Sequence, residues 1–136
     1  MWEHFHHQAD IGIRGVGDTL AEAFKEGAIA LTAVIADPSK VQAKESISIE
    51  SHADEPDLLF ADWINALIYE IDVRKMLFSR FDVQIDGGHL TAQIWGEPAD
   101  PARHEIAVEV KAATFMALKV FQDDSGQWVA QCVVDV

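Results

Sequence analysis

The sequence predicts an α+β fold, with a largely antiparallel sheet or sheets packed against two main helices at about residues 19–36 and 57–72. Two long segments carry apolar residues at helical spacing, and several short segments alternate as strands do. Two glycine-containing turns join pairs of these strands, as in β-hairpins. With 136 residues, the whole chain from 1 to 136 is expected to form one domain.

The first elements are a strand region and a helix. Residues 2–14 have the partly alternating pattern of one or two strands, which Gly15 and Gly17 are expected to end. The segment Thr19-Leu20-Ala21-Glu22 has the pattern of a capping box, in which the hydroxyl and the carboxylate satisfy free amides at the start of a helix. Asp37-Pro38 is expected to end this helix, because proline disfavours a helical residue before it.

The middle of the chain predicts a strand, the second helix and a hairpin. Residues 45–51 alternate, and the acids and proline of residues 54–57 suit a helix start. Strands are expected at 77–85 and 90–96, because Asp86-Gly87-Gly88 is a strong hairpin signal.

The last third predicts a second hairpin. Residues 104–111 give no clear pattern, whereas 113–121 and 127–134 are expected to be strands joined by residues 123–126.

The net charge of the chain limits the kinds of partner that it can bind. Ten basic residues against 23 acidic ones give a net charge of −13, which opposes strong binding of RNA or DNA. A basic protein surface or a cation is the more natural partner, although the charge could simply keep the protein in solution.

The single cysteine, Cys132, allows no internal disulfide and lies in an apolar run, where it is expected to be a buried hydrophobic residue. The N-terminus lacks the pattern of a signal peptide, and no apolar run reaches membrane-spanning length, so a cytoplasmic protein is expected, without membrane attachment. His4, His6 and His7 are interpreted as native structure, because Phe5 interrupts them.

No familiar catalytic motif is visible, and the chain is not expected to be an enzyme. There is no phosphate-binding glycine loop, no nucleophilic serine motif and no zinc-ligand spacing. An isolated histidine such as His104 is more often structural than catalytic. A small hydrolytic enzyme that uses acidic residues remains a less favoured alternative.

Two carboxylates stand out from the many surface acids. Asp10 lies between Ala9 and Ile11 in an apolar strand-like segment, where an unpaired acid is costly to bury. Asp135 is followed only by Val136, whose main-chain carboxylate would add a third acidic group. If the first and last strands are neighbours, these groups converge and suit a hard divalent cation. From the spacing alone this is weak evidence, and two ordinary acids at strand ends with a frayed terminus are the favoured interpretation.

Short motifs along the whole chain resemble those of the archease family, in one collinear order. The opening segment His7-Gln8-Ala9-Asp10-Ile11-Gly12-Ile13 resembles the first family motif. The further matches are Gly17 to Phe24, the helix from Asp57 to Trp63, Gly96-Glu97 with His104, Val110-Lys111-Ala112-Ala113-Thr114, and the ending Val134-Asp135-Val136.

This resemblance implies an accessory protein of the RNA-splicing ligase that promotes ligase guanylylation and multiple turnover in tRNA splicing or RNA repair. It also implies a divalent metal ion, calcium by family precedent, held by Asp10, Asp135 and Val136, with Lys111 acting beside them. The other function discussed for archease-like proteins is that of a chaperone or modulator of further RNA-processing enzymes, such as tRNA methyltransferases.

Three positions depart from the family pattern. Gln8 stands where many members have threonine, Met116 where many have histidine, and Asn65 or Ala66 where an acid is common. These departures leave the three expected metal ligands intact and bear on the contacts with a partner.

Overall fold

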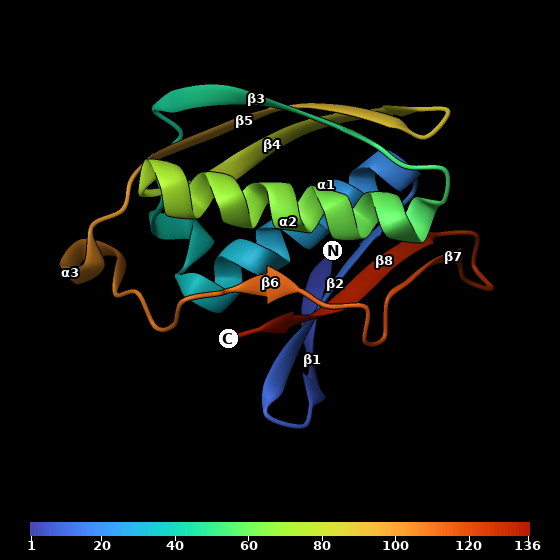
Figure 1. The fold of residues 1–136 in the computed structure, drawn as a ribbon, viewed down its shortest axis with the longest axis horizontal. Helices are drawn as coiled ribbons and strands as arrows, with labels where there is room; N and C mark the ends of the chain where they lie inside the picture. Colours follow the sequence, from blue (N-terminus) through green and yellow to red (C-terminus); the bar gives the residue numbers. More distant parts are fainter.

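In the computed structural model, which describes all residues from Met1 to Val136, two antiparallel sheets enclose two long helices. Figure 1 shows α1 and α2 as a layer with β3, β5 and β4 on one side and β2, β8 and β6 on the other. The elements are β1 (Trp2–His7), β2 (Asp10–Gly17), α1 (Leu20–Ile35), a 3-10 turn (Pro38–Lys40), β3 (Glu45–His52), α2 (Pro56–Arg74), β4 (Met76–Asp86), β5 (His89–Pro98), α3 (Pro101–His104), β6 (Ala112–Ala113), β7 (Lys119–Gln122) and β8 (Trp128–Asp135). The predicted α+β class and both main helices are confirmed.

The five-stranded sheet, here called sheet A, brings the two ends of the chain together. Its strand order is β1-β2-β8-β6, and β7 also pairs with β8. The second sheet, sheet B, has the order β3-β5-β4. Helix α1 packs on β2 and β8 of sheet A and on β4 of sheet B, so the helices share their apolar residues with two sheets rather than one.

Helix α1 begins with the predicted capping arrangement. The Thr19 hydroxyl accepts a hydrogen bond from the Glu22 amide at 3.1 Å. The Glu22 carboxylate accepts one from the amide of Asp18 at 2.9 Å, one residue earlier than in the standard capping box. Free amides at the helix start are therefore satisfied by both side chains.

Gly15 does not end the first strand region, contrary to the prediction, because β2 continues through it and ends at Gly17. A side chain at Gly15 would have its Cβ 2.1 Å from the carbonyl oxygen of Ala23 in α1. Glycine is required here because the strand backbone lies directly against the helix.

Helix α2 is joined to α1 through a buried tryptophan. Trp63 is fully buried and its indole N–H donates to the carbonyl oxygen of Phe24 at 3.0 Å. A buried indole needs such an acceptor, so this bond fixes how the two helices lie against each other.

The β4–β5 hairpin turns at Gly87 and Gly88, whose φ angles of 56° and 82° are the positive values that a two-residue hairpin turn requires. The second predicted hairpin is also present, formed by β7 and β8. Its first strand is interrupted, however, because residues 114–118 form a bulge between β6 and β7 instead of continuous strand. The bulge exposes Phe115 and Met116, and the sequence pattern did not reveal it.

The segment that follows β5 is held by a buried carboxylate. Glu97 is 2% exposed and forms an ion pair with Arg103 at 2.6 Å. It also accepts the amide of Gln42 at 2.8 Å and lies 2.9 Å from Nε2 of the buried His104. Nδ1 of His104 accepts the amide of Asp100, so Nε2 carries the hydrogen and donates it to Glu97. His104 is thus structural, as the sequence analysis favoured.

Cys132 is fully buried in the core, and burial raises the pKa of its thiol to about 12. The prediction that it is a buried hydrophobic residue is confirmed. None of the helices combines the length and apolar character that a membrane crossing requires.

Candidate functional site

The second strand and the last strand are neighbours, and their ends bring Asp10 and Asp135 to adjacent positions. Strands β2 and β8 pair antiparallel, and their ladder ends at Ile11 opposite Val134. Asp10 and Asp135 occupy the next position on each strand. Because side chains alternate between the faces of a sheet, these two acids lie on the face opposite that of the core residue Val134.

A third strand adds Lys111 beside Asp135. In β6, Ala112 pairs with Asp135, and the amide of Lys111 donates to the carbonyl oxygen of Asp135 at 2.8 Å. Continuing this register puts Lys111 beside Val136. We call Asp10, Lys111, Asp135 and Val136 the charged end of sheet A; Figure 1 shows β6 beside β8 next to the C-terminus.

The charges of this end are not neutralised within the chain. Asp135 and Lys111 are exposed, whereas Asp10 and Val136 are half-buried. None of the ion pairs in the structure involves Asp10, Asp135 or Lys111. Two neighbouring carboxylates without a basic partner attract a cation, and a lysine without an acidic partner remains available to an anion.

The side chains alone do not make a complete metal site. No group of three or more histidine, cysteine, aspartate or glutamate residues is arranged to hold a metal ion. Two carboxylates supply oxygen ligands of the kind that calcium and magnesium prefer, and further oxygens would come from the main chain or from water. The residues therefore fit a hard divalent cation with an incomplete set of side-chain ligands.

His7 is a candidate that the sequence analysis did not single out. It pairs with Asp10 across the β1–β2 hairpin, and its Nδ1 is buried without a hydrogen-bond partner. An unsatisfied buried nitrogen is uncommon in folded proteins. The pairing of strand positions, which places both side chains on one face, was the signal that could have identified it.

His4, on the same strand as His7, makes a different contact. Nε2 of His4 lies 2.8 Å from the carbonyl oxygen of Ala30 in α1, so this residue attaches β1 to the helix. The interpretation of the histidine-rich start as native structure agrees with the observed strand β1.

The three departures from the family pattern lie around the charged end. Gln8 is in the turn before Asp10, with a φ of 52°. Asn65, on α2, accepts the amide of Ala113 through its side-chain oxygen at 2.9 Å and so holds β6 against the helix. Met116 is in the exposed bulge, and its carbonyl oxygen accepts the amide of Val133.

The fold is that of a small α+β protein with two antiparallel sheets around two helices, and one end of its sheet A carries two acids and a lysine. The chain matches the model of the Archease protein family (MTH1598/TM1083) over residues 2–136. The chain belongs to the archease family.

Relatives support this membership over the full length. The chain is 41% identical to protein archease of Pyrococcus furiosus, covering 100% of this chain and 99% of the relative. It is 39% identical to protein archease of Sulfurisphaera tokodaii, covering 99% and 98%.

Solved structures have the same fold. The solution structure of Methanobacterium thermoautotrophicum protein 1598 is similar with a TM-score of 0.87 at 34% identity, covering 99% of this chain and 98% of that one. A crystal structure of an archease, "possible chaperone", from Thermotoga maritima has a TM-score of 0.65 at 21% identity, covering 100% and 98%, and supports the fold alone.

Proposed function

We propose that this chain is an accessory protein of the RNA-splicing ligase, which promotes guanylylation of the ligase and its multiple turnover in tRNA splicing or RNA repair. The observation that supports this function best is the convergence of Asp10 and Asp135 at the end of neighbouring strands, without a basic side chain to neutralise them. Membership of the archease family supports this proposal, and the ligase is the partner that the resemblance of the sequence implies.

We propose that the charged end of sheet A binds a divalent cation, which the resemblance to the family implies is calcium. Asp10, Asp135 and the main-chain carboxylate of Val136 would hold it, and His7, which pairs with Asp10 across the hairpin, would help to position Asp10. When bound, such an ion would supply positive charge for phosphate oxygens.

The chain's own groups would act by position and charge. Asp10 and Asp135 are held by the β2–β8 ladder, which fixes the distance between the strands that carry them. The main chain of Lys111 is bonded to Asp135, so this residue is held at the same end of sheet A as the acids, and its exposed ammonium group would be available to a phosphate group of a nucleotide.

The acidic surface suits a basic partner. A ligase that binds RNA and a nucleoside triphosphate needs a positively charged active-site surface. The net charge of −13 would therefore steer this protein toward that surface rather than toward the RNA itself.

A turnover assay tests the function. Ligase in catalytic amount, GTP, metal and RNA ends with a cyclic phosphate and a 5′-hydroxyl are incubated with and without this protein. We expect several ligation events per ligase with the protein and about one without it. Equal product in both reactions would reject the activator role.

The eight exposed large hydrophobic side chains give some support to a chaperone role as a second candidate. The most exposed is Phe115 at 74%, next to Met116 in the bulge. Suppression of aggregation of a denatured RNA-processing enzyme, lost in Phe115→Ser, would favour this role; no suppression by the wild-type protein would exclude it.

A further inference from the structure

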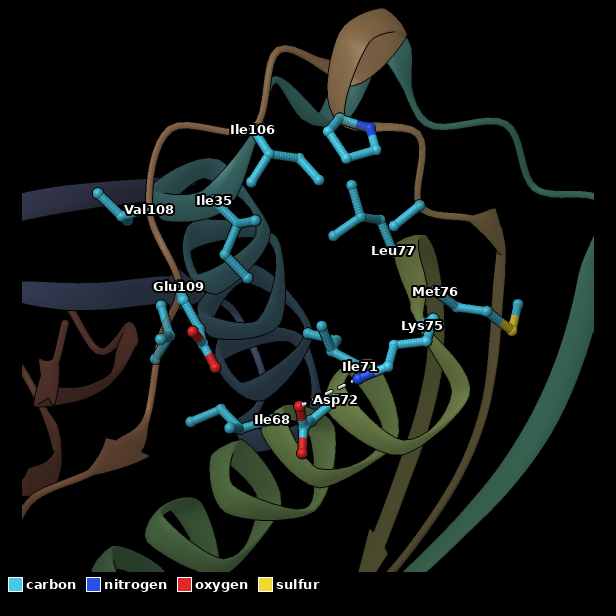
Figure 2. A pocket seen from close by; sticks show the side chains of 13 residues that line it. Ile35, Ile68, Ile71, Asp72, Lys75, Met76, Leu77, Ile106, Val108 and Glu109 are labelled. Atoms are coloured by element: carbon cyan, nitrogen blue, oxygen red, sulfur yellow. Dashed lines mark ion pairs between the residues drawn. The ribbon is translucent and has the colours of Figure 1, made fainter.

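An apolar cavity lies between the two helices and the segment after β5, away from the acids of the charged end. It has a volume of about 390 Å³ and is formed by the C-terminal ends of α1 and α2, the start of β4 and residues 99–110. Figure 2 shows the side chains of Ile35, Ile71, Leu77, Ile106 and Val108 around it. The volume is at the lower end of the range for ligand-binding pockets, ~300–1,000 Å³.

The lining restricts what can bind. Apart from Asp72, Lys75 and Glu109, every lining residue is isoleucine, leucine, valine, methionine, alanine or proline, without an aromatic ring or an uncharged polar side chain. Nucleotides and sugars need stacking surfaces or hydrogen-bonding side chains, which this cavity does not offer. An aliphatic group fits the chemistry of the walls.

The charged residues of the lining favour a cation next to that aliphatic group. Asp72 and Lys75 form an ion pair at 3.7 Å, with both side chains exposed. Glu109 is also exposed and has no ion-pair partner. Figure 2 shows its carboxylate across the cavity from Leu77. Two acids against one base leave an excess negative charge at the cavity.

The cavity is continuous with the surface that carries Lys111. A second hollow of about 350 Å³ shares Ile68, Asp72, Glu109 and Val110 with the first and extends to Lys111. Glu109 therefore lies between the apolar cavity and the charged end of sheet A. A single partner surface that faces Lys111 can reach the cavity as well.

We propose that this cavity receives an aliphatic side chain, flanked by a lysine or arginine, from the same protein partner whose active site the charged end of sheet A serves. The inference rests on the proposed function, since that function supplies the partner. The cavity would then provide binding affinity, while Asp10, Asp135 and Lys111 act on guanylylation. A few side chains that fill well-packed, desolvated pockets supply most of the binding energy of a protein interface.

The test measures binding to purified ligase and stimulation of guanylylation for four full-length proteins: wild type, Val108→Phe, Glu109→Lys and Glu50→Lys. Val108→Phe fills the cavity, and Glu109→Lys reverses the unpaired charge there. Glu50→Lys makes the same charge change on β3 of sheet B, where the side chain is also exposed. Because Glu109 is exposed, its variant keeps the test valid even if Val108→Phe folds poorly.

We expect both cavity variants to bind the ligase at least tenfold more weakly, a loss of about 1.4 kcal/mol. At saturating protein they should still stimulate guanylylation, and Glu50→Lys should bind within about twofold of wild type, a change of ~0.4 kcal/mol. If the cavity variants bind as tightly as wild type while wild type stimulates the ligase, the inference is wrong and the proposed function stands.

Two other results would also overturn the inference. If wild type neither binds nor stimulates the ligase, the proposed function is wrong, and the inference that rests on it is wrong as well. If sedimentation shows that wild type self-associates and that Val108→Phe and Glu109→Lys do not, the occupant of the cavity is a second copy of this chain.

Discussion

Asp10 and Asp135 are separated by almost the whole chain and yet lie at neighbouring positions, one step beyond the last paired residues of β2 and β8. The antiparallel ladder holds both main chains, so the neighbouring positions of the two residues are a property of the fold. On the other side of Asp135, the amide of Lys111 is bonded to its carbonyl oxygen. The proposed function rests on this arrangement of three strands.

Removing either acid should weaken metal binding. We expect Asp10→Asn and Asp135→Asn each to lower calcium affinity by at least about tenfold, because each substitution removes a charged oxygen ligand from a site with few side-chain ligands. Isothermal titration calorimetry measures this loss. Asp82→Asn, at an exposed position on β4, is the matched control. Unchanged affinity in both site variants would show that the acids do not bind the metal.

His7 should contribute to the same site through its nitrogen. His7→Phe keeps a ring of similar size but removes Nδ1, which is buried without a partner beside Asp10. We expect roughly a tenfold lower affinity for a divalent cation, the effect typical of a residue that positions or supplements a ligand. Equal affinity of His7→Phe and wild type would make His7 a packing residue only.

Glu97 should stabilise the protein in a pH-dependent way. The ion pair with Arg103, the amide of Gln42 and the hydrogen bond from His104 lower the pKa of Glu97 from 4.5 to about 2. A lowered pKa means that the stabilisation is fully present above pH 4.5 and is lost as the pH falls toward 2.

The matching measurement is urea unfolding of wild type and Glu97→Gln at pH 7 and at pH 3. At pH 7 the variant should lose ~2 kcal/mol of unfolding free energy, because hydrogen bonds to a buried charged group are removed. At pH 3 the difference should be smaller. An equal difference at both pH values would contradict the role assigned to the ionised carboxylate.

Association with the ligase should depend on salt. The net charge of −13 attracts a basic partner over a distance that salt screens, ~10 Å at 0.1 M ionic strength. We expect the association rate to fall by about tenfold or more as ionic strength rises from 0.05 to 0.5 M, with a smaller change in the dissociation rate. Stopped-flow fluorescence would measure both, and a rate independent of salt would argue against electrostatic steering.

The sequence predicted the elements better than their arrangement. Apolar periodicity and the capping residues located α1 and α2, and the glycine turn located the β4–β5 hairpin. The position of the helices between two sheets depends on contacts such as Trp63 with Phe24, which no local pattern contains. Gly15 was misjudged because a glycine that ends a strand and one that lies against a helix look the same in sequence.

The candidate site was only partly predictable. The sequence analysis treated the pairing of the first and last strands as a condition for bringing Asp10 and Asp135 together. In the structure the second strand, β2, pairs with the last strand, β8, and brings these residues to adjacent positions. The orphaned nitrogen of His7 and the bulge that exposes Phe115 depend on burial and on strand register. Residue patterns along one chain do not contain that information.

The most direct test of the central claim is guanylylation of purified ligase by labelled GTP, with metal and with wild type, Asp10→Asn, Asp135→Asn or Asp82→Asn. We expect wild type and Asp82→Asn to raise the amount of guanylylated ligase equally, and the two site variants to raise it little or not at all while unfolding at the wild-type temperature. Full stimulation by Asp10→Asn and Asp135→Asn would contradict the claim that the charged end of sheet A acts on the ligase.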